Sequence, residues 1–121
     1  PPPAPAPGPA GGGRAEPRAV RIVRDYLDQH LDERVSLDDL VEAVGVPRFR
    51  LYRAFERATG MTPHAYQRQA RVRRAIELLK TGASLADIAV AAGFSDQAHF
   101  TRSFHARMAL TPGAFRSALG N

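Results

Sequence analysis

Apolar residues recur every three or four positions from residue 17 to the end of the chain, a spacing that predicts helices throughout. In the first predicted helix the apolar face consists of Val20, Val23, Tyr26, Leu27 and Leu31. No stretch alternates apolar and polar residues with a period of two, so the sequence predicts no strand. We therefore expect an all-α fold.

Start and stop signals divide the rest of this region into six further helices. Ser36 and Ser84 each precede an apolar run and have an aspartate three residues later, a pattern typical of a capped helix start. Thr62-Pro63 and Thr111-Pro112 each place proline at a first helical position. The predicted helices span about residues 36–45, 47–59, 62–81, 84–93 and 96–108, with a short one from 112.

The second half of this region repeats the first. Gly45 and Gly93 are 48 residues apart, as are Ser36 and Ser84, and after the glycine the offset becomes 49. Each copy has the order helix, tight turn, helix, and we expect the turn glycine to adopt positive φ. One such copy could be an ordinary pair of packed helices. The duplication favours two helix-turn-helix motifs joined by the long helix predicted over 62–81.

The second helix of each copy has a polar side suited to DNA. In the helix over 47–59, Leu51 and Phe55 lie on the core side, whereas Phe49 and Arg53 lie opposite. An aromatic ring can rest on a thymine methyl group, and arginine can pair with guanine. The helix over 96–108 is less basic, so we expect it to contribute less to binding.

Charge is segregated along the chain, which has a net charge of +5 with 16 of its 17 basic residues being Arg. Residues 47–74 contain eight Arg and one acid, whereas residues 25–42 contain seven acids and one Arg. This pattern predicts a polyanionic partner, although a solvated basic surface gives the same composition.

Several function classes are excluded by what the 121 residues lack. Without cysteine there is no disulfide, thiolate nucleophile or cysteine-ligated zinc. The four His are scattered, no catalytic triad or phosphate-binding loop is present, and no apolar run approaches about 18 residues. We expect a protein that is not an enzyme, with no cofactor, no metal and no membrane span.

The N-terminal segment differs in composition from the rest. Residues 1–13 are only Pro, Ala and Gly and cannot bury enough surface to become ordered. We therefore predict a disordered linker over 1–16 and a folded domain over 17–118. Because the chain starts with Pro, we expect it to be a fragment that once followed another folded part, although a trimmed start codon would look the same.

The chain from about residue 19 to 118 resembles the DNA-binding domain of the AraC/XylS family of bacterial transcription regulators. The matching stretches are SLDDLVEAVGV, LYRAFERATGMTPHAYQRQARVRRAIELL, SLADIAVAAGFSDQAHFTRSF and TPGAFR. The most specific of these is GFSDQAHFTRSF.

This resemblance implies two helix-turn-helix units on a long helix, with two recognition helices in successive major grooves of double-stranded DNA. The implied DNA-binding residues are Arg48, Phe49, Arg50, Tyr52 and Arg53 in the first unit and Gln97, Ala98, His99 and Arg102 in the second. It further implies action in the cytoplasm, at the nucleoid, and contact with RNA polymerase if the protein is an activator. A small-molecule effector would act only through a domain absent from this chain.

Three positions depart from the family pattern. Pro47 stands where a Ser cap is usual, Ala98 replaces a common Ser, and Ala109 replaces the usual Gly after the sixth helix, where strain or shortening is expected. An alternative function is a helical protein-interaction module that uses Phe49 and Tyr52 as anchors. Salt separates the two functions, because DNA binding weakens steeply with salt and apolar anchoring does not.

Overall fold

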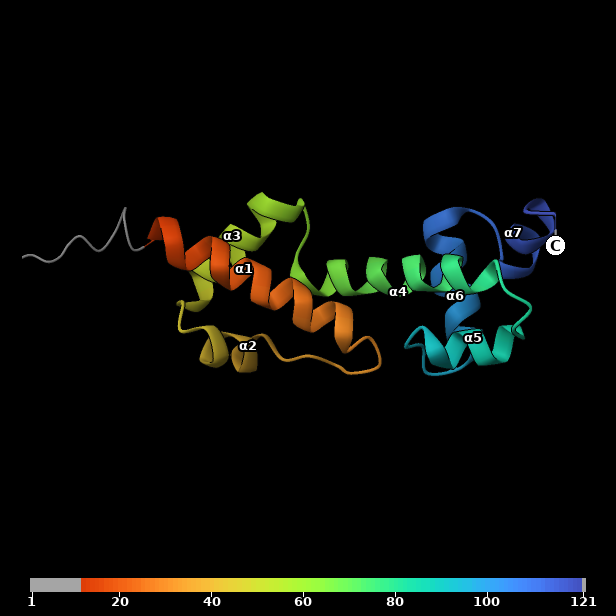
Figure 1. Cartoon of the computed structure of the whole chain (residues 1–121), viewed down its shortest axis with the longest axis horizontal. Helices are drawn as coiled ribbons and strands as arrows, with labels where there is room; N and C mark the ends of the chain where they lie inside the picture. The colour runs from red at the N-terminus through yellow and green to blue at the C-terminus, as the bar shows by residue number, and fades with distance from the viewer. Residues whose placement is uncertain (1–11, 121) are drawn as a thin grey trace, which may run out of the picture. The chain divides into compact units, whose positions relative to one another are not determined.

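The computed structural model describes residues 12–120 (Figure 1). Within this range it contains seven helices and no strand, which confirms the predicted all-α fold. They are α1 (Gly12–Gln29), α2 (Leu37–Val44), α3 (Arg48–Thr59), α4 (Pro63–Leu79), α5 (Leu85–Ala91), α6 (Gln97–Met108) and α7 (Pro112–Ala118). The described chain forms two compact units, one from residues 12–29 and 35–66 and one from 30–34 and 67–120.

The first unit contains the helix-turn-helix pair α2 and α3, with α1 packed on both helices. Val23, Leu51 and Phe55 are fully buried in its core. The Phe55 ring meets the Tyr66 ring edge-on, with centroids 5.5 Å apart. Because Leu51 and Phe55 occupy the inner side of α3, the opposite side of this helix faces solvent.

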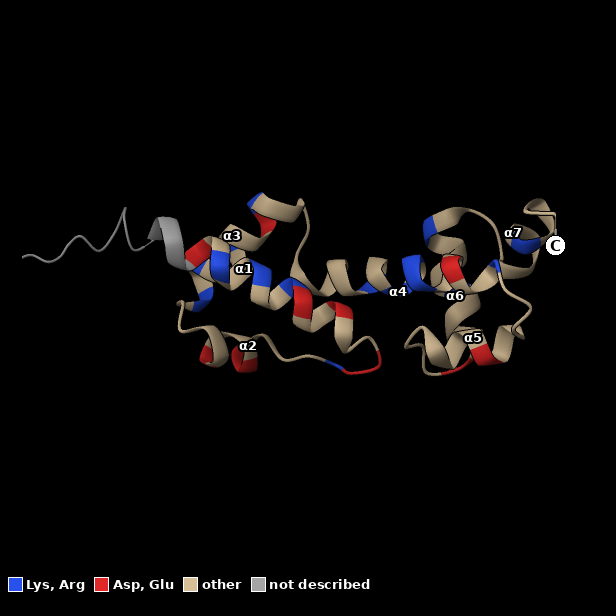
Figure 2. Ribbon diagram, viewed as in Figure 1, with Lys and Arg blue, Asp and Glu red and all other residues tan. Residues whose placement is uncertain are grey.

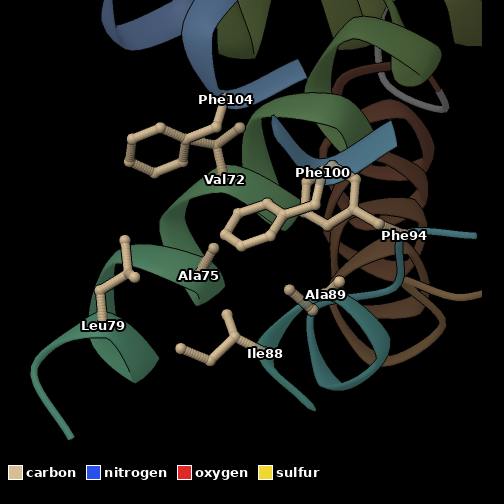
Figure 3. Close-up of a cluster of buried hydrophobic side chains, with 9 residues drawn as sticks. Val72, Ala75, Leu79, Ile88, Ala89, Phe94, Phe100 and Phe104 are labelled. Atoms are coloured by element: carbon tan, nitrogen blue, oxygen red, sulfur yellow. The ribbon is translucent and has the colours of Figure 1, made fainter. Parts of the chain in front are cut away.

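The second unit contains the pair α5 and α6, which pack on each other, with α7 against α6. Its core lies between α4, α5 and α6, where the apolar side chains point toward one another (Figure 3). Phe100 stacks on Phe94 at 5.0 Å between ring centroids and meets Phe104 edge-on at 5.8 Å. This cluster consists of Val72, Ala75, Leu79, Ile88, Ala89, Ala92, Phe94, Phe100 and Phe104.

The two turn glycines both have positive φ, as predicted, with values of +71° at Gly45 and +95° at Gly93. Their surroundings differ. A Cβ at Gly45 would have no atom within 4 Å, whereas one at Gly93 would lie 2.5 Å from the carbonyl carbon of Leu31. Both positions therefore favour glycine because of the backbone conformation. Gly93 has a second reason, because Leu31 leaves no room for a Cβ atom.

The helix ends follow the sequence signals in part. The Ser84 hydroxyl accepts a hydrogen bond from the Asp87 N–H (3.1 Å), and the Asp96 carboxylate accepts one from the His99 N–H (2.7 Å). The predicted side-chain cap at Ser36 is wrong, because its hydroxyl makes no such bond. Ser36 is exposed, so water can satisfy the first N–H groups of α2. Ala109 ends α6 with φ +63°, the only non-glycine residue with positive φ among those described.

The predicted boundary between linker and domain is also wrong for residues 12–16, which are helical because α1 begins at Gly12. Pro17 lies inside this helix, and its fixed φ is compatible with helical geometry at the loss of one backbone hydrogen bond. The rest of the predicted linker, residues 1–11, lies outside the described residues. At its other end α1 stops at Gln29, so Leu31 lies in a loop and not on the apolar face.

The loop of residues 30–34 leaves the helix because side chains of α4 bind its carbonyls. The Gln67 amide, only 4% exposed, donates to the carbonyls of His30 (3.0 Å) and Glu33 (2.8 Å). Arg71 Nε donates to the Leu31 carbonyl at 2.6 Å. Burial lowers the pKa of Arg71, with a further lowering by Arg68 and an opposing effect from Asp32.

Candidate nucleic-acid interface

The solvent side of α3 carries an aromatic ring and a guanidinium group in contact with each other. Phe49 is 70% exposed, so it does not fold back onto a neighbouring helix. The guanidinium carbon of Arg53 lies 5.2 Å from the centroid of the Phe49 ring, a cation–π distance. The ring therefore restricts the positions that the Arg53 side chain can take. Both residues lie at the centre of the exposed face, as the sequence predicts.

The edges of the same face carry arginines that are paired with acids. Arg48 lies 2.7 Å from Asp38 of α2, and both side chains are well exposed. On the other edge, Arg50 Nε donates to Glu16 of α1 at 2.8 Å. Arg57 lies 3.5 Å from the second carboxylate oxygen of Glu16.

Arg57 and Glu16 belong to this edge but are not among the predicted site residues. Tyr52, which is a predicted site residue, lies one turn after Arg48 on the opposite edge and is half-buried. The exposed position of Arg57 follows from the helical period. Its pairing with Glu16 does not follow from that period. The sequence predicts Glu16 in the linker, because it gives no local signal that α1 extends that far.

The exposed face of α6 corresponds to that of α3 but carries fewer charged residues and different polar groups. Gln97, Ala98 and Arg102 are exposed, so they are open to a partner. His99 is half-buried, with its ring edge-on to Phe94 at 5.3 Å. Its Nδ1 accepts a hydrogen bond from the Ser95 N–H at 3.2 Å, so the ring proton is on Nε2. His99 therefore presents one donor, and its other nitrogen is part of the turn before α6.

Charge is distributed as the sequence predicts within the first unit. Acidic residues lie on α2 and arginines on α3 (Figure 2). Helix α3 carries four Arg and one Glu, whereas α6 carries two Arg and no acid. The face of α3 is thus the more basic of the two.

Metal-ligating groups and membrane-spanning helices are both absent from the described part of the chain. Over residues 12–120 no group of three or more His, Cys, Asp or Glu could hold a metal ion. None of the described helices combines the length and apolar character needed to cross a membrane.

Comparison with known proteins identifies the family. Residues 40–118 match a family model described as a helix-turn-helix domain. A solved transcriptional regulator with an AraC-type DNA-binding domain, from Chromobacterium violaceum, is 32% identical, with a TM-score of 0.70 over 89% of this chain and 94% of that one. This chain belongs to the AraC family of helix-turn-helix DNA-binding domains. The family is one of transcription regulators, so the AraC-type domain is not an enzyme.

Two further relatives bear on function. The AraC-type domain is 25% identical to the DNA-binding domain of AdpA, a global transcriptional factor solved in complex with a target DNA, with a TM-score of 0.72 over 83% of this chain and 91% of that one. It is 39% identical over 80 residues to the uncharacterized HTH-type transcriptional regulator YbfI of Bacillus subtilis, covering 66% of this chain and 29% of YbfI. The chain spans about a third of the length of the curated relatives it matches.

Proposed function

We propose that this AraC-type domain binds specific sites in double-stranded DNA and so regulates transcription, with α3 and α6 in successive major grooves. The observation that carries the proposal is the duplicated helix-turn-helix, in which each copy leaves one side of its second helix exposed. The DNA-binding domain of AdpA, solved in complex with a target DNA, supports DNA as the partner.

The face of α3 suggests a division of roles among the predicted residues. A helix in the major groove has base edges below the centre of its exposed face and phosphates along both edges. Phe49 and Arg53 lie at the centre and would contact a thymine methyl group and a guanine. Arg48 and Arg50 lie at the edges and would contact phosphates. Tyr52, half-buried, would contact the sugar-phosphate backbone through its hydroxyl.

The face of α6 would read fewer bases. Gln97 can pair with adenine through two hydrogen bonds, and Arg102 can pair with guanine or a phosphate. Ala98 offers only its methyl group, and His99 offers the Nε2–H donor. Changes in the half-site read by α3 should therefore weaken binding more than changes in the half-site read by α6.

Selection of bound sites from random duplex DNA tests this proposal. We expect one asymmetric site per chain, bound more tightly than a shuffled duplex of the same composition. Inserting about five base pairs, half a helical turn, between the two half-regions should abolish the gain over the shuffled duplex. If the selection enriches no sequence, the domain does not bind DNA in a sequence-specific manner. If the site with the insertion is bound with full affinity, α3 and α6 do not contact DNA at the same time.

Salt dependence separates this function from the alternative, in which Phe49 and Tyr52 anchor a protein partner. Each phosphate contact contributes about 0.9 to the slope of log affinity against log salt, whereas an apolar anchor contributes little.

As part of a regulator the domain would act at the bacterial nucleoid, in the cytoplasm. RNA polymerase is the further partner we propose if the whole protein is an activator, and any effector would bind elsewhere in that protein.

A further inference from the structure

Glu16 of α1 is the one acid that bridges two arginines at the edge of α3 among the described ion pairs. Its carboxylate contacts Arg50 through one oxygen (2.8 Å) and Arg57 through the other (3.5 Å). The Glu16 side chain is only 21% exposed, whereas the paired Arg48 and Asp38 on the other edge are 64% and 75% exposed. The carboxylate of Glu16 is therefore better shielded from water and salt than that of Asp38, whereas its partners Arg50 and Arg57 are 46% and 64% exposed.

The same residues line an open hollow of about 240 Å³ on this face, together with Phe49 and Arg53. Three of the five lining residues are arginines, and the carboxylate of Glu16 is the only anionic group among them. An arginine held by a carboxylate presents the same donors that it would offer to a phosphate oxygen. The carboxylate thus occupies a position that a backbone phosphate would also fit.

We propose that Glu16 is a built-in competitor of DNA phosphate, which holds Arg50 and Arg57 in the free protein and yields them when DNA binds. The inference rests on the proposed DNA-binding function and adds a residue outside the recognition helices that sets its strength. Glu16 reads no base, so it lowers the affinity for all sequences alike. It also reduces salt dependence, because the carboxylate freed from the arginines takes up cations while the DNA releases its own.

The test compares Glu16→Gln with Glu42→Gln in the full chain. Both variants change the net charge by one unit and keep the side-chain shape, but Glu42 is exposed on α2 and belongs to none of the ion pairs above. Affinity for a mixed-sequence duplex of about three helical turns is measured over a salt series, with circular dichroism to verify folding.

For Glu16→Gln we expect tighter binding and a slope of log affinity against log salt that is steeper by up to about 0.9, because no freed carboxylate takes up a cation when the arginines bind phosphate. A fourfold dilution of salt should then increase the affinity ratio of variant to parent by up to about 3.5-fold. Glu42→Gln should change the slope by less than half as much. In a background of Arg50→Ala and Arg57→Ala, Glu16→Gln should act no differently from Glu42→Gln.

The possible outcomes separate this inference from the proposed function. If the parent chain binds no duplex in a salt-dependent manner, the proposed function fails. If the parent binds but Glu16→Gln equals Glu42→Gln, or binds more weakly than the parent, the competitor role is wrong and Glu16 serves only to position α1 or the arginines.

Discussion

Replacing Gly45 and Gly93 separately by alanine distinguishes two reasons for a glycine, because the two residues hold equivalent positions in the repeat. Both have positive φ, +71° and +95°, so alanine adds backbone strain of about 1–2 kcal/mol at either position. The lower entropy of the unfolded chain offsets about 0.4–1 kcal/mol of that strain. Only at Gly93 would the added methyl group also meet the backbone of Leu31.

The magnitude of the second effect follows from the Leu31 contact. The methyl group would lie 2.5 Å from the carbonyl carbon of Leu31 and 2.9 Å from its Cβ, well inside van der Waals distance. This carbonyl is held by Arg71, so it cannot turn aside without losing that hydrogen bond. Overpacking of this kind costs about 1–3 kcal/mol. We therefore expect Gly45→Ala to reduce the free energy of unfolding by roughly 1 kcal/mol and Gly93→Ala by roughly 2–4 kcal/mol.

Urea unfolding followed by far-UV circular dichroism measures both values. Amide hydrogen exchange shows whether the loss caused by Gly93→Ala is concentrated in the unit that contains α5 and α6. Equal losses in the two variants would refute the reasoning, because the approach of Leu31 would then contribute nothing to the requirement for glycine at Gly93.

Three further changes test other features. Ala109→Gly should raise the free energy of unfolding by up to about 1 kcal/mol, because glycine adopts positive φ without strain, whereas Ala106→Gly within α6 should lower it by about 0.5–1 kcal/mol. Melting temperatures that shift in the same direction in both variants would contradict this. Asp96→Ala should cost about 0.5–2 kcal/mol through loss of the α6 cap, and Ser36→Ala, which removes no cap, less than about 0.5 kcal/mol by urea titration. Arg53→Ala should weaken binding to the selected DNA site by about 1–3 kcal/mol without altering the melting temperature, and an equal loss on shuffled DNA would mean that Arg53 contacts phosphate instead of a base.

The elements that the sequence predicts well depend on local chemistry. The helical period places Leu51 and Phe55 in the core and leaves Phe49 outside, and this needs no knowledge of any other segment. The turn glycines follow in the same way, because the repeat sets Gly45 and Gly93 between two apolar runs. The all-α fold and the AraC-type resemblance rest on such signals, and both are confirmed.

The features that the sequence does not reveal depend on partners far along the chain. The pair of Arg50 with Glu16 spans 34 residues, and the bond of Arg71 to the Leu31 carbonyl spans 40. Neither pairing has a periodic signature, so the sequence predicts Glu16 in the linker and Leu31 on a helix face. The capping motif is also an incomplete guide, because the same motif forms the side-chain hydrogen bond at Ser84 and does not form it at Ser36.

Residues 30–34 limit how the polypeptide can be dissected. They lie in sequence between the two segments of one unit, yet they pack with residues 67–120 of the other. A peptide beginning at Gln67 would lack the carbonyls of His30 and Glu33 that satisfy its buried amide, and would expose the surface beside Gly93 where Leu31 lies. No single cut in the chain therefore yields both units intact. If one helix-turn-helix is removed by proteolysis or truncation, the remaining unit also changes, because residues 30–34 are separated from one of the two units.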